Sequence, residues 1–143
     1  MKQPTLTKNK TVIVGCGRLG ASIANKCVEE RKNIVVVDKD RDSLELLSDR
    51  FSGYTTIGDV TDLAVLESAY IKSANEVIVV TGDDNVNIFI AHVAKKIYNV
   101  PNIYVRLADP DDEILLRGMS IHAIYPFELS YDKLNMMRGG RKR

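Results

Sequence analysis

The sequence has few of the residue types that form disulfide frameworks, and few of those that serve in many catalytic sites. Its 143 residues include two cysteines, two histidines and no tryptophan. Cys16 and Cys27 stand in segments expected to point in different directions, which excludes a disulfide framework and a CxxC metal site. No apolar run has the length of a membrane span, and residues 1–10 lack the apolar stretch of a secretory signal. We therefore expect a cytoplasmic protein.

Positive charge is scarce in the body of the chain. The formal net charge is +1, but seven of the 20 lysines and arginines lie in residues 1–10 and 138–143, where there is no acidic residue. Residues 11–137 therefore hold 13 basic and all 19 acidic groups, a net charge of −6. Nucleic-acid-binding domains usually present a basic face to phosphate, so this distribution argues against nucleic acid as the main partner.

What the sequence does contain is a regular alternation of short apolar runs with helical patterns. The expected strands span residues 11–15, 33–38, 53–59, 76–81, 102–107 and 121–126. Several are apolar at nearly every position, as in central parallel strands that are buried on both faces. Such alternation requires right-handed crossovers. It predicts an α/β fold, a Rossmann-like doubly wound parallel six-stranded sheet with helices on both faces.

Helices are expected in the gaps between these strands, and polar residues mark their ends. The second helix falls between residues 39 and 52, where apolar residues recur at helical spacing. Thr61 is a suitable N-cap for a short third helix, and Asp83 or Asp84 is one for the fourth. A fifth helix is expected over residues 109–118, begun by an Asp-Pro pair and closed by glycine.

The length allows one domain with a single core. We expect a flexible N-terminal tail over residues 1–10 and the folded domain over residues 11–128. The remaining residues, 129–143, are expected to form a polar exit segment and a basic tail.

A glycine turn follows the first expected strand. Gly15, Gly17 and Gly20 form G-x-G-x-x-G between a strand and a helix, where the first permits the tight turn, the second lets backbone approach a pyrophosphate, and the third allows close helix packing. The helix N-terminus then faces the phosphates. Asp38 ends the second strand, where its carboxylate can accept hydrogen bonds from ribose hydroxyls and repel a 2′-phosphate. This pattern predicts an adenosine-containing ligand other than NADP.

The pattern leaves more than one function open. The turn could hold a nicotinamide cofactor for a small NAD-dependent oxidoreductase, or for the cofactor half of one, or it could hold a nucleotide as a signal. His92 and His122 are expected to be structural, and no acid–base pair is recognisable. A helix N-terminus could lower the pKa of Cys16 and make it reactive. A redox sensor that contacts DNA is a third alternative, against which the acidic body counts.

Several longer motifs carry a resemblance. The segments "VIVGCGRLGASIA", "GDVTDLAVLESA", "EVIVVTGDDNVNIFIAHVAKK" and "NIYVRLADPDDEILLRGMSIHAIYP" together resemble the TrkA-N domain, also called RCK or KTN, of Trk- and Ktr-type potassium transport regulators. The likeness covers roughly residues 10 to 128. Arg18 after the second glycine and the "GD-x-T-D" block separate these motifs from those of generic dehydrogenases.

The resemblance implies a set of nucleotide-binding residues. These are Gly15, Gly17, Arg18, Leu19 and Gly20 in the phosphate loop, Asp38 and Lys39 at the ribose, Asp59 and Val60 beside the adenine, and Thr81 and Gly82 in the cleft. Arg18 matches a family arginine that reaches a terminal phosphate of ATP, although a surface salt bridge is an alternative. Asp59 could equally cap a helix. Arg106 matches a recurring basic residue, for which structural ion pairing is the simpler interpretation.

The resemblance also implies partners. Family members gate a membrane potassium transporter or channel subunit and bind ATP, ADP or NAD(H) without turning them over. They form homo-oligomers, as dimers or octameric rings, through the last helices and strands of this domain. Many carry a Pro-Glu pair after the sixth strand that is associated with a cation. Here Phe127 separates Pro126 from Glu128, so no metal ligand is assigned.

Overall fold

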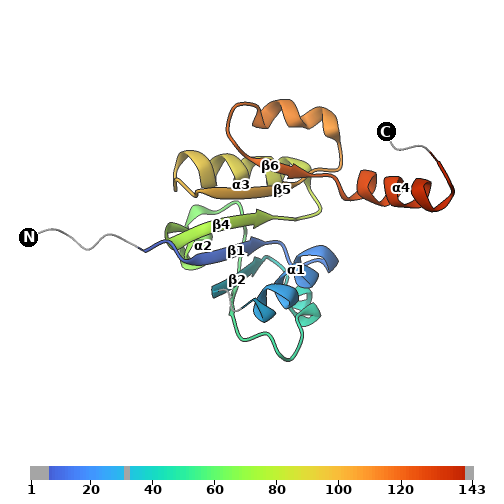
Figure 1. The fold of residues 1–143 in the computed structure, drawn as a ribbon. Coiled ribbons are helices and arrows are strands. Elements are labelled where there is room, and N and C mark those ends of the chain that lie inside the picture. The colour runs from blue at the N-terminus through green and yellow to red at the C-terminus, as the bar shows by residue number, and fades with distance from the viewer. Residues whose placement is uncertain (1–6, 31–32, 141–143) are drawn as a thin grey trace, which may run out of the picture.

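The computed structural model describes residues 7–30 and 33–140. Six strands form one sheet, in which every neighbouring pair is parallel and the order is β3-β2-β1-β4-β5-β6. Their bounds are Lys10–Val14 for β1, Asn33–Asp38 for β2, Tyr54–Ile57 for β3, Ala74–Val79 for β4, Asn102–Arg106 for β5 and His122–Ile124 for β6. The predicted Rossmann-like sheet is confirmed, and its strand order reverses between β1 and β4 (Figure 1).

Helical segments connect the strands. They are α1 (Arg18–Glu29), η1 (Arg41–Leu46), α2 (Leu63–Ser68), η2 (Ile71–Ser73), α3 (Asp84–Lys96), η3 (Pro110–Leu116) and α4 (Pro126–Met137), where η denotes a 3-10 helix. The second and fifth predicted helices are therefore wrong in type. No residue of η1 is buried and only Leu116 of η3 is, so neither segment has the apolar stripe that stabilises an α-helix by packing.

The predicted helix ends agree in part with the structure. Asp83 caps α3, since its carboxylate accepts hydrogen bonds from the amides of residues 85 and 86. The N-cap of α2 is Asp62 and not Thr61, because the Asp62 carboxylate accepts from the Ala64 amide at 2.9 Å. The Thr61 hydroxyl instead donates to Asp59 at 2.7 Å.

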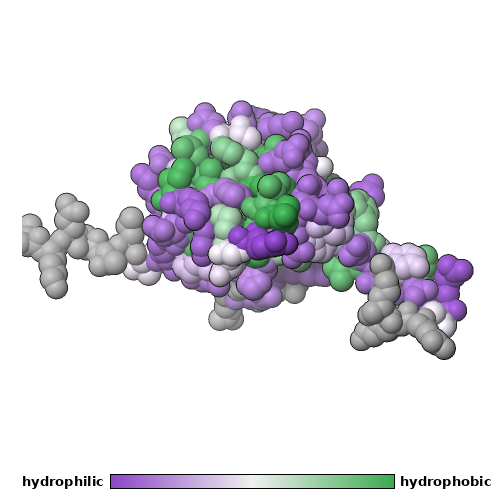
Figure 2. Space-filling model, turned by 90° about the horizontal axis from the view of Figure 1, so that it is seen from above, coloured by the Kyte–Doolittle hydropathy of each residue, from purple (hydrophilic) through white to green (hydrophobic). Residues whose placement is uncertain are grey.

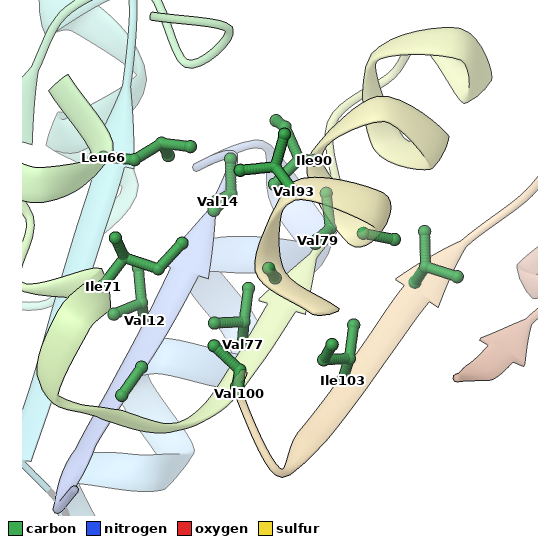
Figure 3. Close-up of a cluster of buried hydrophobic side chains, with 14 of the residues drawn as sticks. Val12, Val14, Leu66, Ile71, Val77, Val79, Ile90, Val93, Val100 and Ile103 are labelled. Carbon is green, nitrogen blue, oxygen red and sulfur yellow. The ribbon is translucent and has the colours of Figure 1, made fainter. Parts of the chain in front are cut away.

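Two apolar layers cover the two faces of the sheet. Side chains alternate along each strand, so Val12 and Val14 face one layer with α2, η2 and α3, whereas Ile13 faces the other layer with α1. Figure 3 shows the larger layer, in which Leu66 of α2 and Ile90 of α3 lie over these valines. Helices therefore flank both faces, as predicted.

The two ends of the chain differ from the expected tail and exit. Lys10 belongs to β1, and the Lys8 ammonium donates to the carbonyl of Tyr98 at 2.9 Å, so the domain begins before residue 11; residues 1–6 lie outside the described part. At the other end α4 begins with Pro126, a favoured first residue of a helix. The predicted boundary at residue 128 thus falls inside α4.

The helix α4 extends away from the body of the domain (Figure 1). None of its residues is buried, although it carries large apolar side chains, namely Phe127, Leu129, Tyr131, Leu134, Met136 and Met137. Within the described residues, no helix is both long and apolar enough to cross a membrane.

Candidate functional site

A cavity of about 490 Å³ opens at the carboxyl ends of the central strands. Its walls come from the ends of β1, β2, β4 and β5, which places it at the point where the strand order reverses. Ligands bind in this crevice in open parallel α/β sheets. Its lining consists of Gly15, Gly17, Asp38, Lys39, Ser43, Asp59, Val60, Thr61, Val80, Thr81, Gly82, Asp83, Val86 and Arg106. We call this cavity the cleft.

The three glycines have different structural roles. Gly15 adopts a φ of +103°, and a Cβ there would lie 2.9 Å from the Thr81 amide nitrogen. A Cβ on Gly20 would lie 2.0 Å from the Gly15 carbonyl oxygen, so only glycine allows α1 to pack directly on the turn. A Cβ on Gly17 would meet no atom within 4 Å. Gly17 therefore leaves open space beside the backbone, which a ligand can occupy.

The N-terminus of α1 lacks the usual side-chain capping. Gly17 is its N-cap, so no side chain accepts a hydrogen bond from the first amides, and the first turn holds no acidic residue. These amides and the positive end of the helix dipole lie beside the cleft. Such an arrangement binds the phosphate of a ligand.

Asp38 is held rigidly at the end of β2. Its Oδ2 accepts a hydrogen bond from the Cys16 amide at 2.7 Å, and its Oδ1 accepts one from the Asp40 amide at 2.8 Å. Each carboxylate oxygen has a further lone pair, so two more donors can be bound. Asp38 therefore presents fixed acceptors to the cleft, next to the glycine turn.

The surroundings of Cys16 disfavour a reactive thiolate. Its side chain is fully buried, and burial, with the nearby charge of Asp38, raises the pKa of the thiol. The direction of this pKa change is opposite to the lowering considered for a helix N-terminus, because Cys16 is buried in the apolar layer around Ile13. Cys16 also does not line the cleft.

A buried amide that sequence reasoning did not assign organises the β4 side of the cleft. Asn87 of α3 is fully buried, and its Oδ1 accepts hydrogen bonds from both the amide and the hydroxyl of Thr81. Its Nδ2 donates to the carbonyl oxygens of Thr81 at 3.0 Å and Arg106 at 2.9 Å. One side chain thus joins the ends of β4 and β5. The sequence signal for this buried amide was an asparagine at a helix position expected to face inward.

Asp59 and Lys39 lie on the opposite side of the cleft, at its rim. The Asp59 carboxylate accepts hydrogen bonds from the hydroxyl and the amide of Thr61, at 2.7 and 2.9 Å. These bonds, followed by the charge of Lys39, lower the pKa of Asp59. Asp59 therefore shapes the turn before α2 and lines the cleft at the same time.

Eight of the eleven predicted site residues line the cleft, and the other three do not. Arg18 is exposed and lines a separate shallow hollow on α1 with Asn25 and Lys26. Leu19 packs against the smaller apolar layer, and Gly20 is covered by the turn itself. The role of Arg18 at a terminal phosphate stays a prediction.

Arg106, by contrast, lies in the lining and forms no ion pair within residues 7–30 and 33–140. The ion pairing expected for it is therefore not seen there. Its guanidinium carbon lies 5.6 Å from the centroid of the Phe127 ring, at the start of α4.

Comparison with known proteins identifies the family. Residues 11–126 match the TrkA-N domain. The chain belongs to this family. The Trk system potassium uptake protein TrkA of Streptomyces coelicolor is 34% identical over 123 residues, which are 86% of this chain and 55% of that protein. The chain thus spans about half the length of the curated relatives it matches.

Two solved structures have the same fold. GsuK bound to ADP has a TM-score of 0.78 at 22% identity, and the match covers 94% of this TrkA-N chain and 35% of that chain. The GsuK channel bound to NAD has a TM-score of 0.69 at 20% identity, with coverage of 85% and 22%. At sequence identities this low, the comparison shows a shared fold only.

Proposed function

We propose that this TrkA-N domain binds an adenine nucleotide in the cleft and thereby regulates a membrane potassium transporter or channel from the cytoplasmic side. One observation carries the proposal. A rigid carboxylate suited to ribose, that of Asp38, stands beside the uncapped N-terminus of α1, which is suited to phosphate. Its relatives named as Trk system potassium uptake proteins support the potassium part.

The ligand is ATP, ADP or NAD(H), oriented by these two features. The ribose hydroxyls donate to the Asp38 oxygens, and the phosphates lie over Gly17 and the first turn of α1. The adenine lies toward Asp59 and Val60, which line that side of the cleft. Solved structures of GsuK with ADP and with NAD support this range of ligands. The carboxylate of Asp38 would repel the additional phosphate of NADP.

The nucleotide acts as a signal and is not turned over. Regulation requires that two conformations of the domain bind nucleotides with different affinity, because equal affinity would leave their populations unchanged. The oxidoreductase alternative needs a group that transfers a proton during the hydride step. The described lining holds no imidazole or thiol, and each of its three carboxylates, those of Asp38, Asp59 and Asp83, accepts a hydrogen bond from a backbone amide.

We further propose that the domain forms homo-oligomers through apolar side chains outside the cleft. On the face shown in Figure 2, apolar side chains form patches among polar ones. Exposed apolar residues of α3 and η3 include Phe89, Ile114 and Leu115, with exposed fractions of 45%, 60% and 51%. The helix α4 presents a second such surface. Patches of this kind mark protein–protein contacts. Analytical sedimentation of Ile114→Asp beside the parent protein would test the α3–η3 patch, since the variant should form fewer oligomers.

Calorimetric titration with ATP, ADP, NADH and NADPH tests the central proposal. We expect one site per chain, binding of at least one of the first three ligands, and markedly weaker binding of NADPH. Nucleotide recovered after prolonged incubation should be unchanged. Absence of binding to all four ligands would overturn the proposal, and detectable hydride transfer would favour the oxidoreductase.

A further inference from the structure

The strand β3 forms an open edge of the sheet. It pairs with β2 on one side, and no strand of the described part of the chain pairs with its other side. Three of its four residues are exposed, with exposed fractions of 60% for Tyr54 and 45% for Ile57. The neighbouring segment η1 contributes no buried residue. A strand in this position offers unpaired backbone groups to another strand.

The hydrogen bonds to β2 show which backbone groups of β3 point outward. The Gly58 amide donates to the Asp38 carbonyl at 3.0 Å, so Gly58 is directed toward β2. Because this direction alternates along a strand, Thr56 is also directed toward β2. The amides and carbonyls of Thr55 and Ile57 therefore point away from the sheet, toward the open side.

The edge also lacks the features that keep edge strands apart in monomeric proteins. Natural edges are commonly protected by charged side chains, proline or a bulge. Residues 51–58 contain no charged residue and no proline, and the pairing of β2 with β3 runs without a shift in register. The four residues of β3 are all β-branched or aromatic, the types that favour strands. This composition suits a strand that is paired on both sides.

The strand β3 is complementary to a second copy of itself. An antiparallel pair centred on Thr56 places Thr55 of each copy opposite Ile57 of the other. Both residues direct their backbone groups outward, so each such pair exchanges two hydrogen bonds and no outward group is left over. Thr56 lies opposite its own copy on a two-fold axis, as a threonine pair of the kind that stabilises sheets.

The ends of β3 also fit this arrangement. Tyr54 stands opposite Gly58 of the second copy, so its ring lies over a residue without a side chain. The Lys10 ammonium lies 5.7 Å from the centroid of the Tyr54 ring and has no carboxylate partner among the described residues. The antiparallel direction brings this cation toward Asp59 of the second copy, which follows Gly58. Opposite charges therefore approach each other at both ends of the contact, which favours this partner.

We propose that β3 pairs with β3 of a second copy of the chain across a two-fold axis at Thr56, so that two domains share one continuous sheet. The contact lies at the opposite edge of the sheet from β6 and from η3, which leads into β6. It is therefore separate from the apolar contacts proposed above, and it does not depend on the nucleotide site. Two separate contact surfaces on one chain let dimers join into a larger assembly.

Disulfide formation in the full chain tests the register. Opposite residues of a non-hydrogen-bonded antiparallel pair have Cα atoms about 4.5 Å apart, which a disulfide can bridge. Thr56→Cys should therefore form a covalent dimer under mild oxidation with copper–phenanthroline. Ser52→Cys is the matched control, because Ser52 is more exposed than Thr56 but lies at opposite ends of the contact in the two copies. Both native cysteines are buried.

We expect about tenfold more covalent dimer from Thr56→Cys than from Ser52→Cys, since only the first pair has the required geometry. Equal yields from the two variants, or no covalent dimer from Thr56→Cys, would overturn the inference. The second outcome would leave β3 to an extended segment of another protein. Ile114→Asp, which tests the apolar contacts, should leave the cross-linking of Thr56→Cys unchanged, so the two contacts can fail separately.

Sedimentation provides a second test. Ile57→Lys puts a charge on the edge, and Ile97→Lys makes the same change at an exposed residue at the end of α3. Two cross-strand contacts are altered in the first variant, so we expect the dissociation constant of this dimer to rise by about tenfold. Ile97→Lys should associate like the parent protein, and circular dichroism checks that both variants fold. Unchanged association of Ile57→Lys, or an equal loss in Ile97→Lys, would refute the pairing.

Discussion

Replacement of Asn87 by leucine should destabilise the domain more than any exposed substitution. The change keeps a similar volume but removes the four hydrogen bonds of the buried side-chain amide. Three backbone groups then lose this partner, namely the Thr81 amide, the Thr81 carbonyl and the Arg106 carbonyl. A buried polar group that loses its partner costs about 1–3 kcal/mol. Because Thr81 and Arg106 are half-buried, we take the low end of this range for their groups. The expected loss is then about 3–5 kcal/mol, a large part of the 5–15 kcal/mol typical of a domain.

Urea denaturation followed by circular dichroism measures this loss. Asn85→Leu is the matched control, because Asn85 lies on the same helix, is exposed, and undergoes the same change in helix propensity. We expect the control to stay within about 0.5 kcal/mol of the parent protein. The reasoning is refuted if the two variants differ by less than about 1 kcal/mol, a margin set by the desolvation cost of one group.

Three further predictions concern the turn, the ribose acceptor and pH. Gly20→Ala should lower stability by about 1–3 kcal/mol through overpacking, which denaturation would measure. Gly17→Ala should fold almost normally but bind nucleotide poorly, which calorimetry would measure. Asp38→Asn should weaken ADP binding by about tenfold, since it loses charged acceptors; unchanged affinity would exclude the ribose contact. Burial, with the charge of Glu113 nearby, raises the pKa of Tyr125 from 10.0 to about 12. The unfolded state therefore loses this proton first, and the urea midpoint should fall as pH rises from 10 to 12, but less steeply in Tyr125→Phe.

The fold and half of the site could be predicted because their signals are local. A buried parallel strand such as Ile34–Val37 needs apolar residues at every position, and this requirement is visible in the sequence. The turn from Gly15 to Gly20 is equally local, since a Cβ on Gly15 or Gly20 would clash within the turn or with the segment that follows β4, whereas Gly17 leaves open space. The place of Asp38 in the cleft could be predicted because Asp38 ends a strand.

The remaining features depend on contacts between distant segments. Asn87 donates to the Arg106 carbonyl across 19 residues, and its inward position on the helix signals burial but not this partner. Arg106 enters the cleft because its strand ends beside β4, whereas Arg18, inside the glycine motif, faces outward from α1. The helical spacing between residues 39 and 52 predicted an α-helix, but η1 has no buried residue whose packing would stabilise one.

A structure of the protein crystallised with ADP would test the central claim most directly. We predict the ribose hydroxyls within hydrogen-bond distance of both Asp38 oxygens, and the diphosphate over Gly17 and the first turn of α1. Adenosine bound elsewhere, such as in the hollow beside η3 lined by Asp111 and Arg117, would contradict the account, as would phosphates that make no contact with α1.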